Sequence, residues 1–193
     1  MNTSQNIDPH VISADAQIVR GGNGTIFIDQ GCIIHPKAKI VAEGDCSIFI
    51  GKYNIIEENV IIRATPKFNP QSNLKENINL MIGNYNIFKV GSEIENATIH
   101  HHNFFDYRCK IEENTIEPKC IITPGVKLPR KITIKSGAII IDDSTTMPNY
   151  NFNEEENVAK VKALYGLLAP VLLKVKTMQL INNMLVSGSQ MMN

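Results

Sequence analysis

The chain has 193 residues, which is enough for one domain with a sizeable hydrophobic core. Lys+Arg and Asp+Glu each number 19, so the chain lacks the basic excess of proteins that bind nucleic acid or anionic membranes. We expect no signal peptide in the first ten residues and no membrane span, because no apolar run approaches ~20 residues. The four cysteines show no CxxC spacing, which predicts reduced thiols in the cytoplasm.

A six-residue repeat begins at Ile12 and continues to Ile140. Large apolar residues recur at this period, and a mostly small residue follows each of them after four positions. An amphipathic helix would repeat every ~3.6 residues and a half-buried strand every ~2, so neither accounts for the spacing. The pattern predicts an all-β domain over residues 1–141: a left-handed parallel β-helix of about six to seven coils, each with three short strands and three corners. The large positions include Ile28, Ile34, Ile40, Ile50, Ile56, Ile62, Ile82, Phe88, Ile94, Ile99, Phe105, Ile111, Ile116, Ile122, Leu128 and Ile134.

The spacing departs from six residues at regular intervals. The gap is ten residues after Ile18 and Ile40, twenty after Ile62, and five after Ile94 and Ile111. Each departure follows a third repeat position, and three repeats close one coil. We therefore expect all irregular connections to lie at the same corner of the triangular prism, which leaves the other two corners plain.

The longest irregular connection comprises residues 64–80 and contains two prolines and several asparagines. Such a segment is either a tolerated surface insertion or a loop that contacts a partner. In the second interpretation Phe68 is the apolar anchor, and Phe68, Asn69 and Pro70 are the candidate partner-binding residues.

The repeat ends after Ile140, and breaker residues predict a linker over residues 142–153. An amphipathic helix is expected over residues 154–186, with Asn153 as its N-cap and three glutamates in its first turn. Pro170 removes an amide donor, so we expect a kink there. Residues 187–193 are expected to be a disordered tail.

The predicted helix carries an apolar stripe that must be buried. The nearest surface is the β-helix, either along one face or over its last coil, where the helix would also shield an open strand edge. A contact with another subunit is the alternative. The stripe comprises Val158, Val161, Tyr165, Leu168, Leu172, Val175, Met178 and Ile181.

Enzymes with this predicted fold include acyltransferases that use a histidine base. The chain has five histidines, namely His10, His35, His100, His101 and His102. The first precedes the regular repeats, and the second follows an inward position and is expected on the outer surface. Three adjacent histidines cannot form a tetrahedral metal site alone, because alternation turns the middle side chain away from its neighbours. We interpret the run as a surface strand or corner.

The stretch IVRGGNGTIFID resembles the early part of the γ-class carbonic anhydrases, which hold zinc with three histidines between subunits. In IGKYNIIEENVIIR and IHHHNFFD, the resemblance places the three ligands at Arg63, His101 and Asp106. Arginine keeps its proton and cannot bind Zn²⁺, so we expect no zinc site and no other cofactor. The cysteines supply no replacement ligands, because three of them occupy small inward positions: Cys32, Cys109 and Cys120.

The segments IIHPKAKIVAEGD, IGKYNIIEENVIIRA and MIGNYNIFKVGSEIE together resemble the dynactin subunit 6 family. The resemblance extends from Ile12 to Ile140, and more loosely over the C-terminal helix. It differs in the HHH run, in a shortening near Ile116 and in the tail after Met184.

This resemblance implies a non-catalytic subunit at the pointed end of dynactin, where the family helps dynein engage membranous cargo. The implied partners are a second left-handed β-helix subunit (subunit 5), the pointed-end actin-related protein and a larger zinc-bearing subunit. The implied location is the cytoplasm and the cytoskeleton, with the kinetochore as a further site. The alternative is a γ-carbonic-anhydrase-like or acyltransferase enzyme that acts as a homotrimer.

Overall fold

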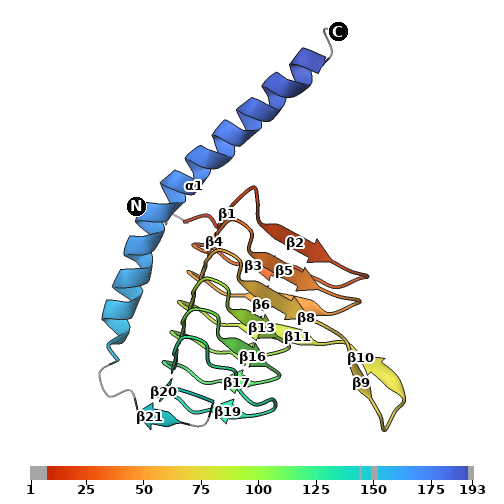
Figure 1. Ribbon diagram of the computed structural model, residues 1–193, viewed down its shortest axis with the longest axis vertical. Helices are drawn as coiled ribbons and strands as arrows, with labels where there is room; N and C mark the ends of the chain where they lie inside the picture. The colour runs from red at the N-terminus through yellow and green to blue at the C-terminus, as the bar shows by residue number, and fades with distance from the viewer. Residues whose placement is uncertain (1–7, 144, 149–151, 191–193) are drawn as a thin grey trace, which may run out of the picture.

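The computed structural model describes residues 8–143, 145–148 and 152–190, with side chains described only to residue 179 in the last range. Its main body is a stack of triangular coils (Figure 1). All strand pairs between successive coils are parallel. This arrangement confirms the predicted left-handed parallel β-helix.

Three sheets form the three sides of the prism, here called faces A, B and C. Face A contains seven parallel strands, which correspond to seven coils, and one antiparallel strand at its end. Its strands are β1 (Val11–Ile12), β4 (Ile33–Ile34), β7 (Ile55–Ile56), β12 (Ile87–Phe88), β15 (Phe104–Phe105), β18 (Ile121–Ile122), β20 (Ala138–Ile140) and the antiparallel β21 (Thr146–Pro148).

Faces B and C complete each coil. Face B contains β2 (Gln17–Arg20), β5 (Lys39–Ala42), β8 (Ile61–Ala64), β13 (Glu93–Glu95) and β16 (Lys110–Glu112). Face C contains β3 (Ile26–Ile28), β6 (Ser47–Ile50), β11 (Asn79–Ile82), β14 (Thr98–Ile99), β17 (Thr115–Ile116) and β19 (Thr133–Ile134).

The large repeat residues fill the interior of the prism. From Ile34 to Ile122, every repeat position is at most 3 % exposed. Burial of one such aliphatic side chain contributes about 1.5–3 kcal/mol. Phe88 and Phe105 stack in successive coils with ring centroids 4.7 Å apart. Since the register places like residues above one another, the interior is one continuous apolar column.

All irregular connections lie at the corner between faces B and C, the B–C corner, as the spacing predicts. Residues 64–80 form a hairpin there, with β9 (Lys67–Asn69) antiparallel to β10 (Leu74–Glu76). The hairpin projects from the side of the stack (Figure 1). Ala64 and Leu80, at the ends of this segment, are fully buried and belong to the core.

The corner between faces C and A, the C–A corner, repeats without insertions. One residue of each turn there has a left-handed backbone, with φ between 54° and 73°. Glycine adopts this conformation at no steric cost, whereas other residues adopt it only where the surrounding contacts compensate. The stacked positions are Gly31, Tyr53, Tyr85, His102, Lys119 and Gly137.

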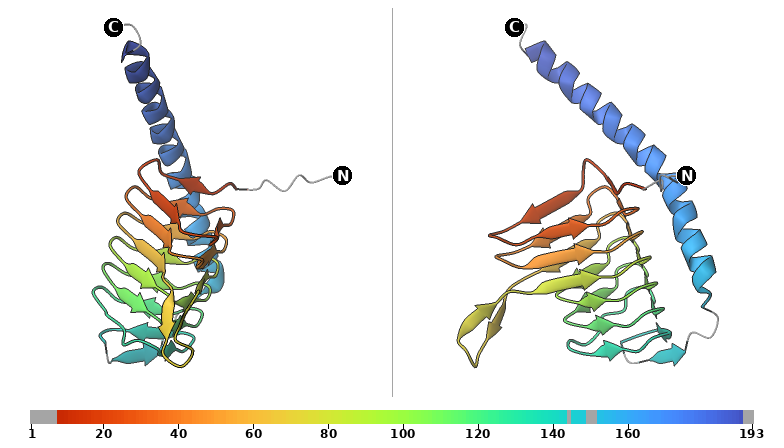
Figure 2. Two further views of the ribbon diagram at one scale, coloured as in Figure 1. Left: turned by 90° about the vertical axis from the view of Figure 1, so that its right-hand side faces the viewer. Right: turned by 180° about the vertical axis from the view of Figure 1, so that it is seen from behind.

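Helix α1 (Glu154–Gln190) lies along face A rather than over the last coil. It starts beside the later coils and projects beyond the first (Figure 2). Among its described side chains, Val161 is fully buried and Ala169 is 6 % exposed. Pro170 lies inside the helix, and the ribbon changes direction near the middle of the helix (Figure 2).

Two expectations for the C-terminal region need correction. Residues 142–153 are not a plain linker, because β21 pairs antiparallel with β20 and extends face A. Residues 187–190, expected to be disordered, continue α1, because no proline interrupts its backbone hydrogen bonding after Pro170. Residues 191–193 lie outside the described residues.

Candidate functional site

The three positions that correspond to zinc ligands lie on different parts of the prism. Arg63 points outward from β8 on face B, with its Nε 3.7 Å from Glu43 Oε1. His101 lies at the C–A corner, where its Nδ1 accepts the backbone N–H of Asn84 at 2.8 Å. Burial lowers the pKa of His101, and the neighbouring histidines lower it further.

Asp106 lies at the corner between faces A and B, just after β15. Its Oδ1 accepts the backbone N–H of Tyr107 at 2.8 Å, which closes the local turn. Within the described residues, no group of three or more His, Cys, Asp or Glu side chains is placed to hold a metal ion. Arg63, His101 and Asp106 therefore each engage neighbours within their own part of the prism.

The third histidine of the run, His102, connects the β-helix to α1. Its ring stacks on Tyr85 at 5.2 Å, and Tyr85 stacks on Tyr53 at 5.3 Å. His102 Nδ1 lies 2.9 Å from Asn157 Oδ1, and Nε2 lies 3.3 Å from Glu154 Oε1. The side chain is only 9 % exposed. The sequence signal for this role was the corner register, which places Tyr53, Tyr85 and His102 at equivalent positions of successive coils.

The first turn of α1 is held by several charges at the same corner. Glu154 Oε2 lies 3.0 Å from Lys119 Nζ. The hydrogen bond from Lys119 and the charges of His102 and Lys119 hold the pKa of Glu154 below its usual value. Asn153 Oδ1 accepts the backbone N–H of Glu156 at 3.1 Å, which is the predicted N-cap. These contacts fix where the helix begins on face A.

His35 follows β4, but its side chain is only 11 % exposed, so it does not lie free on the outer surface as expected. Its Nδ1 lies 2.9 Å from Glu58 Oε1 in the next coil. Burial alone would raise the pKa of Glu58, but the hydrogen bond and the charge of His35 outweigh it and lower that pKa. The following coil therefore ties His35 to a carboxylate.

The cysteines are all free and buried. Burial raises the pKa of Cys32 and Cys109 to about 11, and it raises the pKa of Cys120 as well. A thiol with such a pKa stays protonated near neutral pH and is a poor nucleophile or metal ligand. These side chains occupy small inward positions, in agreement with the packing role inferred from the repeat.

A column of buried asparagines extends the cysteine positions through the middle coils, and sequence reasoning missed it. Asn54 Oδ1 accepts the backbone N–H and the Nδ2–H of Asn86, both at 3.0 Å. Asn86 Oδ1 accepts the backbone N–H of Asn103, and Asn103 Oδ1 accepts that of Cys120, both at 2.8 Å. Each amide oxygen thus accepts a hydrogen bond from the backbone of the following coil, which explains why polar residues are buried here.

The candidate partner-binding residues lie on the hairpin. Phe68 is 61 % exposed on β9, and Asn69 hydrogen-bonds within the hairpin to Glu76 and to the backbone at the turn. Pro70 follows in that turn. Lys67 Nζ lies 3.1 Å from Glu113 Oε2, which ties the base of the hairpin to a later coil. Phe68 is therefore presented to solvent by a segment anchored at its base.

The two ends of the stack differ. At the first coil, β1, β2 and β3 are the edge strands of their sheets, and Ile18 is 37 % exposed although it occupies an inward position. At the last coil, Ile134 and Ile140 are 8 % and 2 % exposed. The first coil therefore has open strand edges on all three faces, whereas at the last coil β21 pairs with β20 on face A and β19 is the open edge strand of face C.

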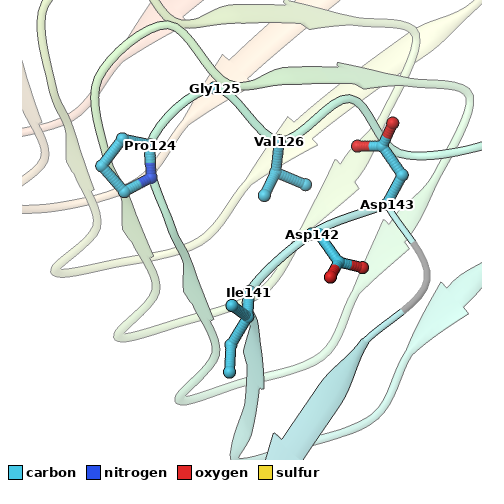
Figure 3. Close-up of a pocket in the computed structure, with 6 residues that line it drawn as sticks. All are labelled: Pro124, Gly125, Val126, Ile141, Asp142 and Asp143. Atoms are coloured by element: carbon cyan, nitrogen blue, oxygen red, sulfur yellow. The ribbon is translucent and has the colours of Figure 1, made fainter.

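A shallow hollow lies beside the last coils (Figure 3). Two carboxylates line it and point in different directions (Figure 3). Asp143 Oδ1 accepts the backbone N–H of Lys127, and Asp142 Oδ1 accepts that of Thr145, both at 2.7 Å. The carboxylates fix loops and do not converge on a ligand. The remaining lining residues are Pro124, Gly125, Val126 and Ile141.

Among the residues described, the one long helix is not apolar enough over a sufficient length to cross a membrane.

No family model matches the chain. Among solved structures, a hexapeptide transferase family protein from Anaplasma phagocytophilum is 16 % identical, with a TM-score of 0.50 over 87 % of this chain and 96 % of that one. This likeness concerns the fold alone. Dynactin subunit 6 of Nematostella vectensis is 29 % identical over 69 % of this chain and 71 % of the relative.

Dynactin subunit 6 of Dictyostelium discoideum is 30 % identical over 169 residues, which are 82 % of this chain and 81 % of the relative. The alignment therefore includes most of both chains rather than a short motif. It agrees with the hexapeptide β-helix and with the segments that resemble this family in the sequence. The chain belongs to the dynactin subunit 6 family.

Proposed function

We propose that this chain is a non-catalytic subunit of dynactin that acts at the pointed end of the complex and supports the attachment of cargo to dynein. Family membership is the observation that carries the proposal. The surroundings of the two buried histidines, His35 and His102, support it. Both rings are buried, and both nitrogens of His102 contact α1, so neither ring is open to a substrate. We expect no cofactor.

The proposed partners are a second left-handed β-helix subunit (subunit 5), the pointed-end actin-related protein and the larger zinc-bearing subunit. A β-helix is a rigid scaffold, so it loses little conformational entropy when a partner binds. That property suits an assembly subunit. The proposed location is the cytoplasm and the dynactin-associated cytoskeleton, including the kinetochore.

Two contact regions are proposed for these partners. The first is the hairpin, where Phe68, Asn69 and Pro70 lie together and Phe68 is largely exposed. The second is the first coil, whose three edge strands carry unpaired backbone groups. A second β-helix could pair with those groups or pack over Ile18.

The test is co-purification of the tagged chain with the three partners. Two variants probe the contact regions: residues 67–76 replaced by a short Gly-Ser link, and a chain that lacks the first coil through Val19. We expect the wild type to recover the partners and each folded variant to recover less. A Phe68→Ser chain and a matched Tyr107→Ser chain, which loses an exposed aromatic ring elsewhere on the surface, separate the hairpin from a general surface effect. Equal recovery by all folded variants would exclude these contact regions.

The enzymatic alternative makes different predictions from the same preparation. A γ-carbonic-anhydrase-like protein would bind about one zinc per chain between subunits and hydrate carbon dioxide. An acyltransferase would transfer an acyl group with a histidine as base. Activity that is lost in His101→Ala or His35→Ala protein would replace the proposal with an enzyme.

A further inference from the structure

The three faces of the prism differ in the side chains that they turn outward. Face A is apolar and carries α1. Every strand of face B contains a charged residue, and several pair across coils, as Lys110 and Glu93 do at 3.5 Å. None of the six strands of face C contains Asp, Glu, Lys or Arg. Face C is therefore the uncharged face that α1 leaves uncovered.

The outward residues of face C form one column. The register places Phe27 beside Phe49, Phe49 beside Met81, and Met81 beside Thr98. Phe27 is 52 % exposed and Met81 is 45 % exposed. Parallel strands lie about 4.8 Å apart, so the three apolar residues span about 10 Å. The column continues as threonines at Thr115 and later positions.

On face A, an equivalent column of outward apolar residues binds helix α1. Its outward residues Val11, Ile33 and Ile55 are at most 2 % exposed, and they pack against the stripe of α1 that includes Val161 and Ala169. The helix lies across the strands, along the stack (Figure 2). A helical turn rises about 5.4 Å, close to the spacing between coils, so each turn can place one apolar residue against each coil.

We propose that the Phe27–Phe49–Met81 column of face C is the docking site of an amphipathic helix from a partner chain. The helix would present an uncharged stripe with apolar residues at i, i+3 or i+4, and i+7. The proposal rests on the proposed function in that the helix belongs to a subunit or adaptor of the same assembly.

The width of face C favours a helix over a second sheet. Strands β3, β6 and β11 are three or four residues long, which corresponds to about 10–13 Å. A helix with its side chains is about 10–12 Å wide. A packed sheet would extend past both corners of the prism, where the hairpin and the turns interrupt the flat surface. A single helix therefore fits the apolar column from side to side.

The experiment places a photo-crosslinking benzoylphenylalanine at Met81 in the full-length chain, expressed in cells and irradiated there. The matched control carries it at Ile61, which points outward from face B between Lys39 and Glu93. Crosslinked peptides are identified by mass spectrometry. We expect crosslinks from position 81 to one segment of another protein with apolar residues at helical spacing, and none to that segment from position 61.

A second pair of variants measures the contribution of the column. Met81→Lys in the purified assembly should lower recovery of the crosslinked partner by about tenfold or more, because it places an unpaired charge in an apolar contact. Ile61→Lys should leave recovery unchanged. Circular dichroism checks that both variants remain folded, as expected for outward positions.

Crosslinks from position 81 to a strand or loop, to a second copy of this chain, or to nothing would overturn the inference. Its failure is distinguishable from failure of the proposed function. If the chain still recovers dynactin subunits while position 81 gives no crosslink, only the face C site is wrong. If the chain recovers no dynactin subunits but position 81 crosslinks to a helix of another protein, the proposed function is wrong although face C binds a helix.

Discussion

The C–A and B–C corners close the same coils but differ in how much the length of the connection varies. The C–A corner has one geometry throughout, and it contains stacked rings, the buried asparagine column beside it, and the contacts that hold the start of α1. The B–C corner contains every change in repeat length and the hairpin. One corner therefore positions the rest of the molecule, and the other presents variable segments to solvent.

A substitution inside the prism should have the largest effect on stability, because both corners depend on the packed interior. Ile56 is fully buried, and Ile56→Asp places a charge there without a partner, which costs several kcal/mol. We expect insoluble or unfolded protein by circular dichroism. Val41→Asp is the control, because Val41 points outward from face B beside Arg63. An Ile56→Asp protein with an unchanged spectrum and melting temperature would show that the inward register is wrong.

Loss of His102 at the C–A corner should have the second largest effect on stability. His102→Ala removes the ring stack on Tyr85 and leaves Asn157 and Glu154 without this partner. We expect a loss of about 1–3 kcal/mol in the free energy of unfolding and faster amide exchange in the first turns of α1. His100 is exposed, so His100→Ala should change stability by less than about 0.5 kcal/mol. Equal effects of the two substitutions would remove the distinction between the corners.

Removal of the hairpin should have a small effect on stability. Its main tie to the stack is the partly exposed pair of Lys67 with Glu113, and such pairs contribute at most about 1 kcal/mol. Replacement of residues 67–76 by a Gly-Ser link should therefore change the free energy of unfolding by less than about 1 kcal/mol in a denaturant titration. Cooperative unfolding at a much lower denaturant concentration would show that the B–C corner also supports the fold.

The smallest expected effect is a pH dependence at the C–A corner. The pKa of Glu154 is lowered in the folded chain, chiefly by the hydrogen bond from Lys119. Its contribution is therefore present above the ordinary carboxyl pKa and is lost as the pH falls through the lowered value. We expect Glu154→Gln to remove a small part of the acid destabilisation below about pH 4.5, measured by thermal unfolding. Glu76→Gln, in the exposed hairpin, is the control.

The repeat predicted the fold and the location of every irregular connection, because both follow from counting residues between inward positions. The N-cap Asn153 was also predictable, since it depends on residues next to it in the chain. The choice of face A for α1 was not predictable, because it depends on contacts between residues far apart in sequence. Residues such as His102 and Asn157 are separated by more than fifty positions.

The candidate site was predictable only in outline. The sequence placed Phe68 in an insertion, but the pairing of β9 with β10 arises from register that the loop composition did not reveal. The exposed column on face C was not predictable from the repeat, because its members are separated by 22 and 32 residues. The unequal connections at the B–C corner hide this alignment from a search at a fixed period.

We propose that the chain is an assembly subunit rather than a metalloenzyme. The most direct test of this proposal is the molar mass and zinc content of the native chain, purified from cells and measured by light scattering and elemental analysis. We predict that the chain elutes with dynactin pointed-end subunits, in a complex whose zinc belongs to a partner, and that the isolated chain is free of stoichiometric zinc. A homotrimer with one zinc per chain, lost in His101→Ala protein, would contradict the account.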